Sequence, residues 1–436
     1  MDTKKLRQKI LDLAIRGKLV PQDPNDEPAS VLLERIRAEK EQLIKEGKIK
    51  RSKKSVASDT SHYENVPFEV PEGWCWTTIG ELFQLQAGKF IEAPQISTCK
   101  DATHIYPCYG GNGLRGYVES YNRDGLFPII GRQGALCGNI NIAEGKFYAT
   151  EHAVVVETFA NIDIQLFVYF LIQLNLNQYA TATAQPGLAV KTINEVPIPL
   201  PPINEQHRIS MAIEKSLDTL SEIDQSKHAI RKSILQLKSR ILDLAISGKL
   251  AAQDCSDEPA LELLRRINPS YASCDNRHYR NVPKGWAVCT FEDILEYEQP
   301  QQYIVNSTDY SDEYEIPVLT AGKSFIIGKT NEKSGICKHL PVIIFDDFTT
   351  DSKYVDFPFK VKSSAMKILH AKGNVNPKYV AYLMSVTRLV GDTHKRYWIS
   401  EYSKIPIMLP PVNEQERIVS LIEKIYDRLD KILAEL

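Results

Sequence analysis

The most regular pattern of apolar and polar positions lies in residues 204–247, a stretch without Gly or Pro. A helix of this length would be roughly 65 Å long and could not bury an apolar stripe against itself. The pattern therefore predicts a long helix, capped by Asn204 and Gly248, with a second long helix beside it. Lys227 is the one seam position that is not apolar. The apolar residues follow steps of mostly three and four, as in a coiled-coil seam, and are Ile209, Ile213, Leu217, Leu220, Ile223, Ile230, Ile234, Leu237, Ile241 and Leu244.

Two blocks of sequence occur twice. Residues 10–19 (ILDLAIRGKL) return at 241–250 (ILDLAISGKL), and at the same spacing NDEPASVLLERI is echoed by SDEPALELLRRI. PLPPINEQHRI from Pro199 is echoed by MLPPVNEQERI from Met408 at a different spacing. On these registers the C-terminal helix stops, and the N-terminal helix starts, about where the long helix would be cut in two. We therefore predict a circularly permuted two-fold repeat.

Shorter elements lie between the repeated blocks. An N-terminal helix is expected to end at Gly17, and another helix is expected over 29–46. Residues 74–202 alternate apolar runs with Gly turns, which is typical of hairpins, and include an apolar helix at 162–180. Residues 278–411 show the same order with different residues. A repeated scaffold that carries two unlike inserts indicates a reader of two different half-targets.

Composition limits the class of protein. A chain of 436 residues with 43% apolar and 25% charged residues predicts two or three ordinary globular domains. The net charge of −2 means that any DNA-binding surface must be a local patch. Eight cysteines without a CxxC pair are expected to be buried or free thiols. The start lacks a signal peptide and no apolar run approaches about 18 residues, so we expect a cytoplasmic protein without a membrane segment.

The motifs of common DNA-acting enzymes are incomplete. GKSFIIGKT lacks the glycine that a P-loop would need at Lys323, and neither Pro-Pro pair has the preceding Asn of an adenine methyltransferase. Asp346 and Asp347 follow an apolar strand, where a metal-binding pair can sit, but no further partner is evident. We expect no catalytic, cofactor-binding or metal-binding residues. A stand-alone nuclease and a helical protein-binding scaffold are the alternative hypotheses.

In combination, the PLPP run followed by NEQ-x-R-I, the ILDLAI-x-GKL block, the Gln-Asp-x-x-x-Asp-Glu-Pro connector and the two divergent inserts resemble the specificity subunit of type I restriction-modification systems, over essentially the whole chain. The resemblance implies an α+β fold with two globular α/β target-recognition domains separated by a pair of long antiparallel helices. It implies a non-catalytic subunit that binds double-stranded DNA with a bipartite target. It also implies two methyltransferase (modification) subunits and restriction subunits as partners.

These patterns divide the chain into alternating scaffold and insert segments. The first target-recognition domain is placed at 62–203 and the second at 278–412. The scaffold helices are placed at 1–20, 204–250 and 413–436, and the connectors at 21–61 and 251–277. In the first connector, the basic run 45–54 is either a solvated linker, which we favour, or an arm that contacts phosphates.

Base sequence is read in the major groove, and two readers on one face of a duplex must sit about one helical turn apart, roughly 34 Å, or a multiple of that. A stiff helical pair can set such a separation, so the number of unread base pairs should follow the helix length. Polar and basic side chains near Gly-rich turns and strand ends are candidates for contacts with bases or phosphates. They are Asn112, Arg115, Arg132, Gln133 and Lys191 in the first domain, and Lys323, Ser324, Lys329, Thr330, Lys395 and Arg396 in the second. Tyr397 and Trp398 are expected to pack rather than to stack on bases.

Overall fold

The computed structural model describes residues 2–49, 66–134, 136–181, 186–271, 282–321, 324–387, 389 and 396–436. The chain divides into two compact units, Met1–Ser226 and Lys227–Leu436. The predicted long helix is confirmed as α6 (Ile203–Ile246), which runs through the boundary between the units. The second half of the basic run 45–54 lies outside the described residues, as do Lys323 and Lys395.

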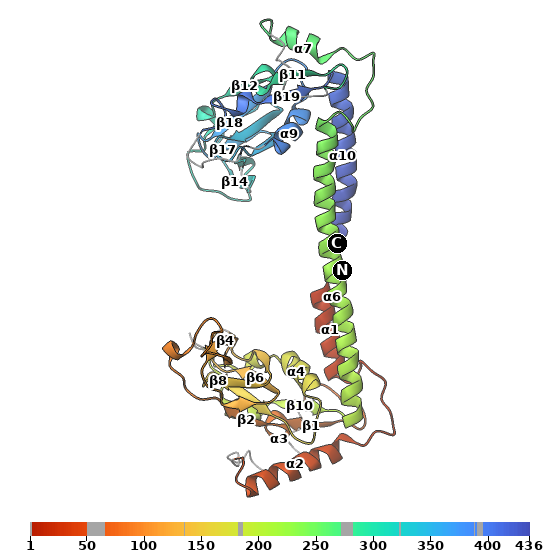
Figure 1. Ribbon diagram of the computed structural model, residues 1–436, viewed down its shortest axis with the longest axis vertical. Coiled ribbons are helices and arrows are strands. Elements are labelled where there is room, and N and C mark those ends of the chain that lie inside the picture. The colour runs from red at the N-terminus through yellow and green to blue at the C-terminus, as the bar shows by residue number, and fades with distance from the viewer. Residues whose placement is uncertain are drawn as a thin grey trace. The chain divides into compact units, whose positions relative to one another are not determined.

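Unit 1 combines short strands with helices of very different length (Figure 1). The helices are α1 (Thr3–Ile15), α2 (Ala29–Lys45), α3 (Ile79–Leu82), α4 (Ile164–Gln173), α5 (Val190–Asn194) and the first part of α6, with the 3-10 turns η2 (Ala93–Gln95) and η3 (Leu176–Tyr179). The strands are β1 (Cys75–Thr78), β2 (Gln84–Ala87), β3 (Tyr106–Gly110), β4 (Gly113–Val118), β5 (Arg123–Asp124), β6 (Phe127–Gly131), β7 (Ile140–Ala143), β8 (Lys146–Ala149), β9 (Ala153–Glu157) and β10 (Pro197–Leu200).

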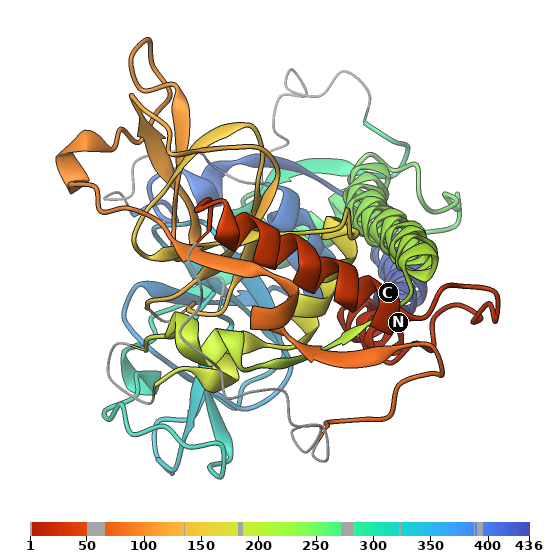
Figure 2. The same ribbon diagram turned by 90° about the horizontal axis from the view of Figure 1, so that it is seen from below.

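These strands form three sheets, with orders β2-β9-β6-β7, β4-β3-β8-β5 and β1-β10. The central strand β9 is buried from Ala153 to Val156, as its unbroken apolar run AVVV predicts. One face of the first sheet shares a core with α4, through Val154, Val156 and Phe167. The segment with η2 and the β3–β4 hairpin, orange in Figures 1 and 2, lies at the margin of the unit in both views.

Unit 2 has the same succession of elements with different residues. Its helices are the rest of α6, α7 (Ala260–Ile267), α8 (Phe291–Ile294), α9 (Pro377–Val386) and α10 (Val412–Glu435), with the 3-10 turns η5 (Gln301–Tyr303) and η6 (Tyr402–Lys404). Its strands are β11 (Ala287–Thr290), β12 (Leu295–Glu298), β13 (Ile316–Leu319), β14 (Ile326–Thr330), β15 (Val342–Asp346), β16 (Ser352–Val355), β17 (Lys360–Val361), β18 (Met366–Ala371) and β19 (Pro406–Leu409). The sheet orders β12-β18-β15-β16, β14-β13-β17 and β11-β19 match those of unit 1, except that no strand stands in for β5 in the part of the chain that is described.

In each unit the repeated sequence blocks form the contact between the globular insert and its long helix, which we call the joint. In unit 1, Trp74 Nε1 donates to Glu205 Oε2 at 2.9 Å, and Arg208 Nη2 donates to Asp26 Oδ2 at 2.6 Å. In unit 2, Trp286 Nε1 donates to Glu414 Oε2 at 2.9 Å, and Arg417 Nη2 donates to Asp257 Oδ2 at 2.6 Å.

The glutamine of the NEQ block makes two further hydrogen bonds in each joint. Gln206 donates to Pro201 O and accepts from the backbone N–H of Asp163, while Gln415 donates to Pro410 O and accepts from that of Asn376. The residues shared by the two repeats are therefore those that attach each globular insert to its helix.

Each part of α6 has an antiparallel helix beside it. In unit 1, Thr3 Oγ1 near the start of α1 donates to Asp224 Oδ1 at 2.8 Å, while Gln22, beyond the end of α1, reaches Glu205. In unit 2, Lys227 Nζ donates to the carbonyl oxygen of Leu436, at the end of α10, at 2.6 Å. The prediction that the chain ends supply the partners of the long helix is confirmed in both units.

The predicted seam is right in part. Ile209, Ile213, Leu220, Ile234 and Ile241 are buried, and Leu217, Ile223 and Leu244 are half-buried. The assignment of Ile230 and Leu237 to the seam is wrong, because their exposed fractions are 42% and 47%. Leu237 is exposed because Lys238 takes the contact position between Ile234 and Ile241: its Nζ lies 2.6 Å from Asp430 Oδ1 and 4.6 Å from the ring centroid of Tyr426.

Two further predictions are confirmed. The described cysteines are free thiols, with Cys274 outside the described residues. Tyr397 and Trp398 pack in the core, with 4% and 2% of their surface exposed.

Candidate nucleic-acid interface

A polar hollow of about 440 Å³ opens beside the β3–β4 hairpin of unit 1. It brings together three residues predicted as DNA contacts, Asn112, Arg115 and Gln133, all of them exposed. The remaining lining residues are Gly110, Gly111, Gly113, Leu114, Gly134 and His152. Two Gly-rich turns, residues 110–115 and 131–134, thus meet at one place.

The turns can meet because glycine leaves room for close backbone contact. A Cβ atom on Gly131, at the end of β6, would stand 1.8 Å from the carbonyl oxygen of Gly111. Gly113 has a φ of +94°, a backbone conformation that side-chain-bearing residues rarely adopt. The glycines therefore seat the hairpin turn directly on the end of β6 and fix where Asn112 is presented.

Arg132 does not line the hollow, unlike its neighbour Gln133. Its backbone N–H donates to His152 O at 3.0 Å, and its carbonyl oxygen accepts from Leu188 N at 2.9 Å. Its Nε is buried and has no hydrogen-bond partner among the described residues, and the same holds for Thr150 Oγ1. Buried polar atoms are normally paired, so these two have unused capacity for a ligand or an ordered water.

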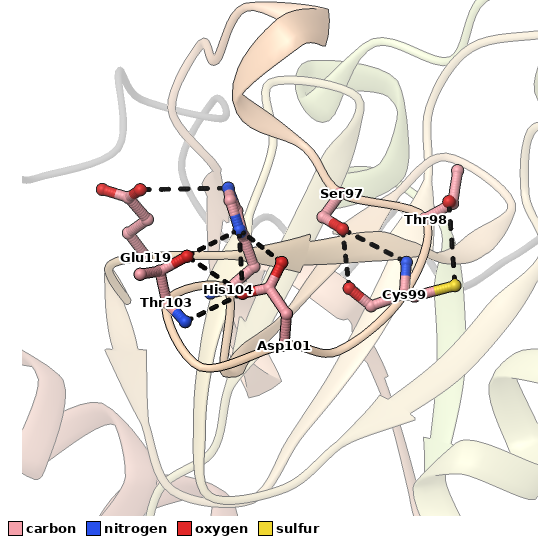
Figure 3. A network of polar contacts seen from close by, with 7 residues as sticks. All are labelled: Ser97, Thr98, Cys99, Asp101, Thr103, His104 and Glu119. Atoms are coloured by element: carbon pink, nitrogen blue, oxygen red, sulfur yellow. Dashed lines mark hydrogen bonds and ion pairs between the residues drawn. The ribbon is translucent and has the colours of Figure 1, made fainter.

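A polar network supports the hairpin from outside (Figure 3). Asp101 Oδ1 accepts from the backbone N–H groups of Thr103 and His104, at 2.8 and 2.7 Å, and these bonds hold the pKa of Asp101 well below its usual range. His104 Nδ1 lies 3.0 Å from Asp101 Oδ2, and its Nε2 lies 3.9 Å from Glu119 Oε1, just beyond β4. The network ties the loop that precedes β3 to the end of β4.

The buried thiol of the hairpin is uncharged. Burial raises the pKa of the Cys108 thiol on β3 to about 11, so this thiol is protonated at neutral pH. The exposed guanidinium of Arg115 supplies a positive charge among the residues that line the hollow. A cation and two amide side chains around one hollow suit contacts with guanine, adenine or phosphate.

Lys191 stands apart from this group. It is exposed on the short helix α5 and does not line the hollow. Leu114 and His152 line the hollow but were missed from the sequence. Leu114 lies inside the predicted turn and could have been included. His152 lies in the turn just before β9, and nothing in the sequence places it beside the hairpin.

The described candidates of unit 2 are more scattered. Ser324 is exposed beside β14, and Lys329 Nζ lies 3.5 Å from the carbonyl oxygen of Asp312. Thr330 is only 1% exposed, and its hydroxyl accepts from Glu332 N at 3.3 Å, so its side chain faces the protein. Arg396 is exposed, with its Cζ atom 5.9 Å from the ring centroid of Phe348.

Asp346 and Asp347 bind protein groups. Asp346 Oδ1 accepts from the backbone N–H groups of Phe348 and Thr349, at 2.9 and 3.1 Å. Asp347 Oδ1 accepts from Trp398 N at 2.8 Å, and its Oδ2 lies 3.5 Å from Lys367 Nζ. Across the described residues, no group of three or more side chains could hold a metal ion. Both carboxylates fix the loop that follows β15.

Comparison with known proteins identifies the family. The model of the type I restriction modification DNA specificity domain matches residues 71–234 and 283–436. The chain belongs to this family. It is a DNA specificity subunit with two recognition domains, and its role in such systems is recognition rather than catalysis.

Relatives differ in how much of this specificity subunit they match. The chain is 29% identical to the EcoAI specificity subunit of Escherichia coli, over 98% of this chain and 90% of that protein. It is 49% identical to the EcoR124I/EcoR124II specificity subunit of Escherichia coli, over 33% of this chain and 38% of that protein. The high identity is thus confined to part of the molecule.

Comparison with a solved structure supports the fold of this specificity subunit. This structure, described as "Structural basis underlying complex assembly and conformational transition of the type I R-M system", is 12% identical, with a TM-score of 0.50 and coverage of 85% of this chain and 94% of that chain. At this identity the likeness concerns the fold alone. No helix within the described residues has the length and apolar character needed to cross a membrane.

Proposed function

We propose that this specificity subunit reads a split DNA target, with one half read by unit 1 and the other by unit 2. The observation that carries the proposal is the contrast between scaffold and insert. The joints at Glu205 and Glu414 share the same hydrogen bond from a tryptophan, whereas the exposed loops of the two units differ in nearly every residue. Two similar joints are suited to binding two copies of one partner protein. Two sets of different loops are suited to binding two different half-targets.

In unit 1, we propose that Asn112, Arg115 and Gln133 contact bases or phosphates from the polar hollow. An arginine suits guanine and an amide suits adenine, in each case through two hydrogen bonds in the major groove. Arg132, whose Nε is buried and has no hydrogen-bond partner among the described residues, also remains a predicted contact. Lys191, and in unit 2 Ser324, Lys329 and Arg396, remain predicted contacts; Lys323 and Lys395, outside the described residues, remain predictions from the sequence.

We propose further that the helical scaffold holds two modification subunits, and that restriction subunits join this complex. Because its target is DNA, we place this activity in the cytoplasm. We also propose that the recognition domains span residues 62–203 and 278–412.

The test exchanges residues 62–203 for the corresponding segment of another specificity subunit. The full chain, produced with its modification subunits, is then assayed by mapping methylated positions in the DNA of the host. We expect one half of the target to change, the other half to persist, and the complex to assemble as before. A change in both halves, or no sequence preference in the unexchanged complex, would refute the proposal.

A further inference from the structure

The reading surface of unit 2 can be located from backbone register, because its hairpin β13–β14 is built like β3–β4 of unit 1. Both hairpins have a bulge at the same step, Cys108/Tyr109 in one and Val318/Leu319 in the other. The carbonyl oxygen of Tyr109 accepts from Thr150 N, and that of Leu319 accepts from Lys362 N. Tyr109 and Leu319 therefore occupy equivalent positions.

This register makes two exposed aliphatic side chains equivalent. Leu114 pairs with Tyr109, and Ile326 pairs with Leu319. Leu114 is 53% exposed and Ile326 is 49% exposed. Two domains that differ in most of their loop residues thus expose an aliphatic side chain at one position, next to the tip of the hairpin.

A second register match connects β6 with β15. The last pair of β6 with β9 is Gly131↔Ala153, and the last pair of β15 with β18 is Asp346↔Met366. The next residue behaves alike in both units. Arg132 donates to His152 O and accepts from Leu188 N, while Asp347 donates to Ala365 O and accepts from Tyr397 N.

The residues that follow are therefore equivalent as well. Phe348 and Thr349 of unit 2 stand where Gln133 and Gly134 line the polar hollow of unit 1. Arg396 precedes Tyr397 as Gly187 precedes Leu188, and Gly187 bridges to Gln133 much as Arg396 lies over Phe348.

Resting on the proposed function, we propose that unit 2 reads its half-target with four side chains at these equivalent positions: Ile326, Phe348, Thr349 and Arg396. Three of the four were not predicted from the sequence. They are less polar than the residues of the hollow in unit 1. An aliphatic and an aromatic side chain suit the methyl group of thymine, and an arginine suits guanine.

The loop that carries Phe348 and Thr349 is held in place by hydrogen bonds within the protein. The carboxylate of Asp346 holds the N–H groups of Phe348 and Thr349, and Asp347 anchors the same loop to Trp398 N. Phe348 supports the guanidinium of Arg396 from one side, within the range of a cation–π contact. A loop held in this way presents Thr349, which is exposed, without further ordering.

The experiment uses the full chain purified with its modification subunits. The probe is a set of DNA duplexes in which one half of the target at a time is randomised, and bound sequences are counted. Leu114→Ala and Ile326→Ala form a matched pair, since both side chains are about half exposed and neither is needed for a core. Thr349→Ala and Arg396→Ala test the loop, and Lys333→Ala, an exposed cation of the same unit, is the control.

We expect Ile326→Ala, Thr349→Ala and Arg396→Ala to weaken base preference roughly fivefold or more in one half of the target only. Leu114→Ala should weaken the other half, and Lys333→Ala should alter neither. The inference is overturned if the three unit 2 variants keep the original preferences in both halves within roughly twofold, or if each weakens both halves equally. Absence of any preference in the unaltered complex would instead overturn the proposed function, before any variant is compared.

Discussion

At the scale of single residues, the joints at Glu205 and Glu414 differ in one hydrogen bond. Glu205 and Glu414 are each 1% exposed, and each accepts a hydrogen bond from a tryptophan. Glu205 Oε1 also accepts from Gln22 Nε2 at 2.7 Å, whereas Glu414 Oε1 is buried with no partner among the described residues. Gln253, which the repeat makes the counterpart of Gln22, is exposed. Burial accordingly raises the pKa of Glu414, against the opposing effects of Trp286 and Arg417.

We predict opposite results for Glu205→Gln and Glu414→Gln. The first removes an acceptor for Gln22 and should lower the free energy of unfolding by about 1 kcal/mol at pH 7. The second removes a costly buried charge and should leave stability unchanged or raise it at pH 7.

The effect of Glu414→Gln should depend on pH. A folded pKa above the unfolded value means that this carboxyl stabilises the fold relatively more at low pH, and that this contribution is lost as the pH rises past its ordinary value of 4.5. The advantage of Glu414→Gln should therefore shrink toward pH 4. Denaturant unfolding of the full chain at pH 4 and pH 7 measures both effects, and equal destabilisation by the two variants at pH 7 would contradict this account.

At the scale of elements, periodicity predicted the helices well and their contacts less well. The apolar stripe on α6 is compatible with two registers of helix packing. Only the contacts with side chains of α10 show which register is formed. Tyr426 donates to the carbonyl oxygen of Lys238 at 2.8 Å, which places Lys238 rather than Leu237 toward α10. The same limit explains the candidate site. Asn112, Arg115 and Gln133 could be proposed from the sequence because glycines mark their turns, whereas Phe348 and Thr349 could be proposed only from strand register, which the sequence does not specify.

A pair of substitutions on α6 separates the two registers. Ile234→Asp places a charge at a buried position and should cost roughly 3–5 kcal/mol of unfolding free energy. Ile230→Asp, four residues away at an exposed position, should change stability by no more than about 0.5 kcal/mol. Thermal unfolding of the full chain measures both, and a comparable loss in the two variants would restore Ile230 to the seam.

At the scale of the whole molecule, α6 is the element that both units share. The boundary between the units falls inside this helix, after Ser226. The contacts of α1 with α6 lie before that point, and those of α10 lie after it. Residues added at the boundary would therefore lengthen the helix without removing a contact within either unit.

Insertion of twenty-two helix-forming residues after Ser226 tests whether this helix sets the spacing of the half-targets. The insert adds about 33 Å at roughly 1.5 Å per residue, and it turns the helix to within about 40° of its original facing. Because this length is close to one turn of the duplex, about 34 Å, the unread spacer should grow by roughly ten base pairs, while both half-targets stay on one face and keep their sequence. An insert of twenty residues, which turns the helix by about 160°, is the control and should abolish binding to any spacer of similar length. Methylation mapping with the full complex reads out both cases. An unchanged spacer in the twenty-two-residue variant would mean that the separation of the two readers is fixed by something other than α6.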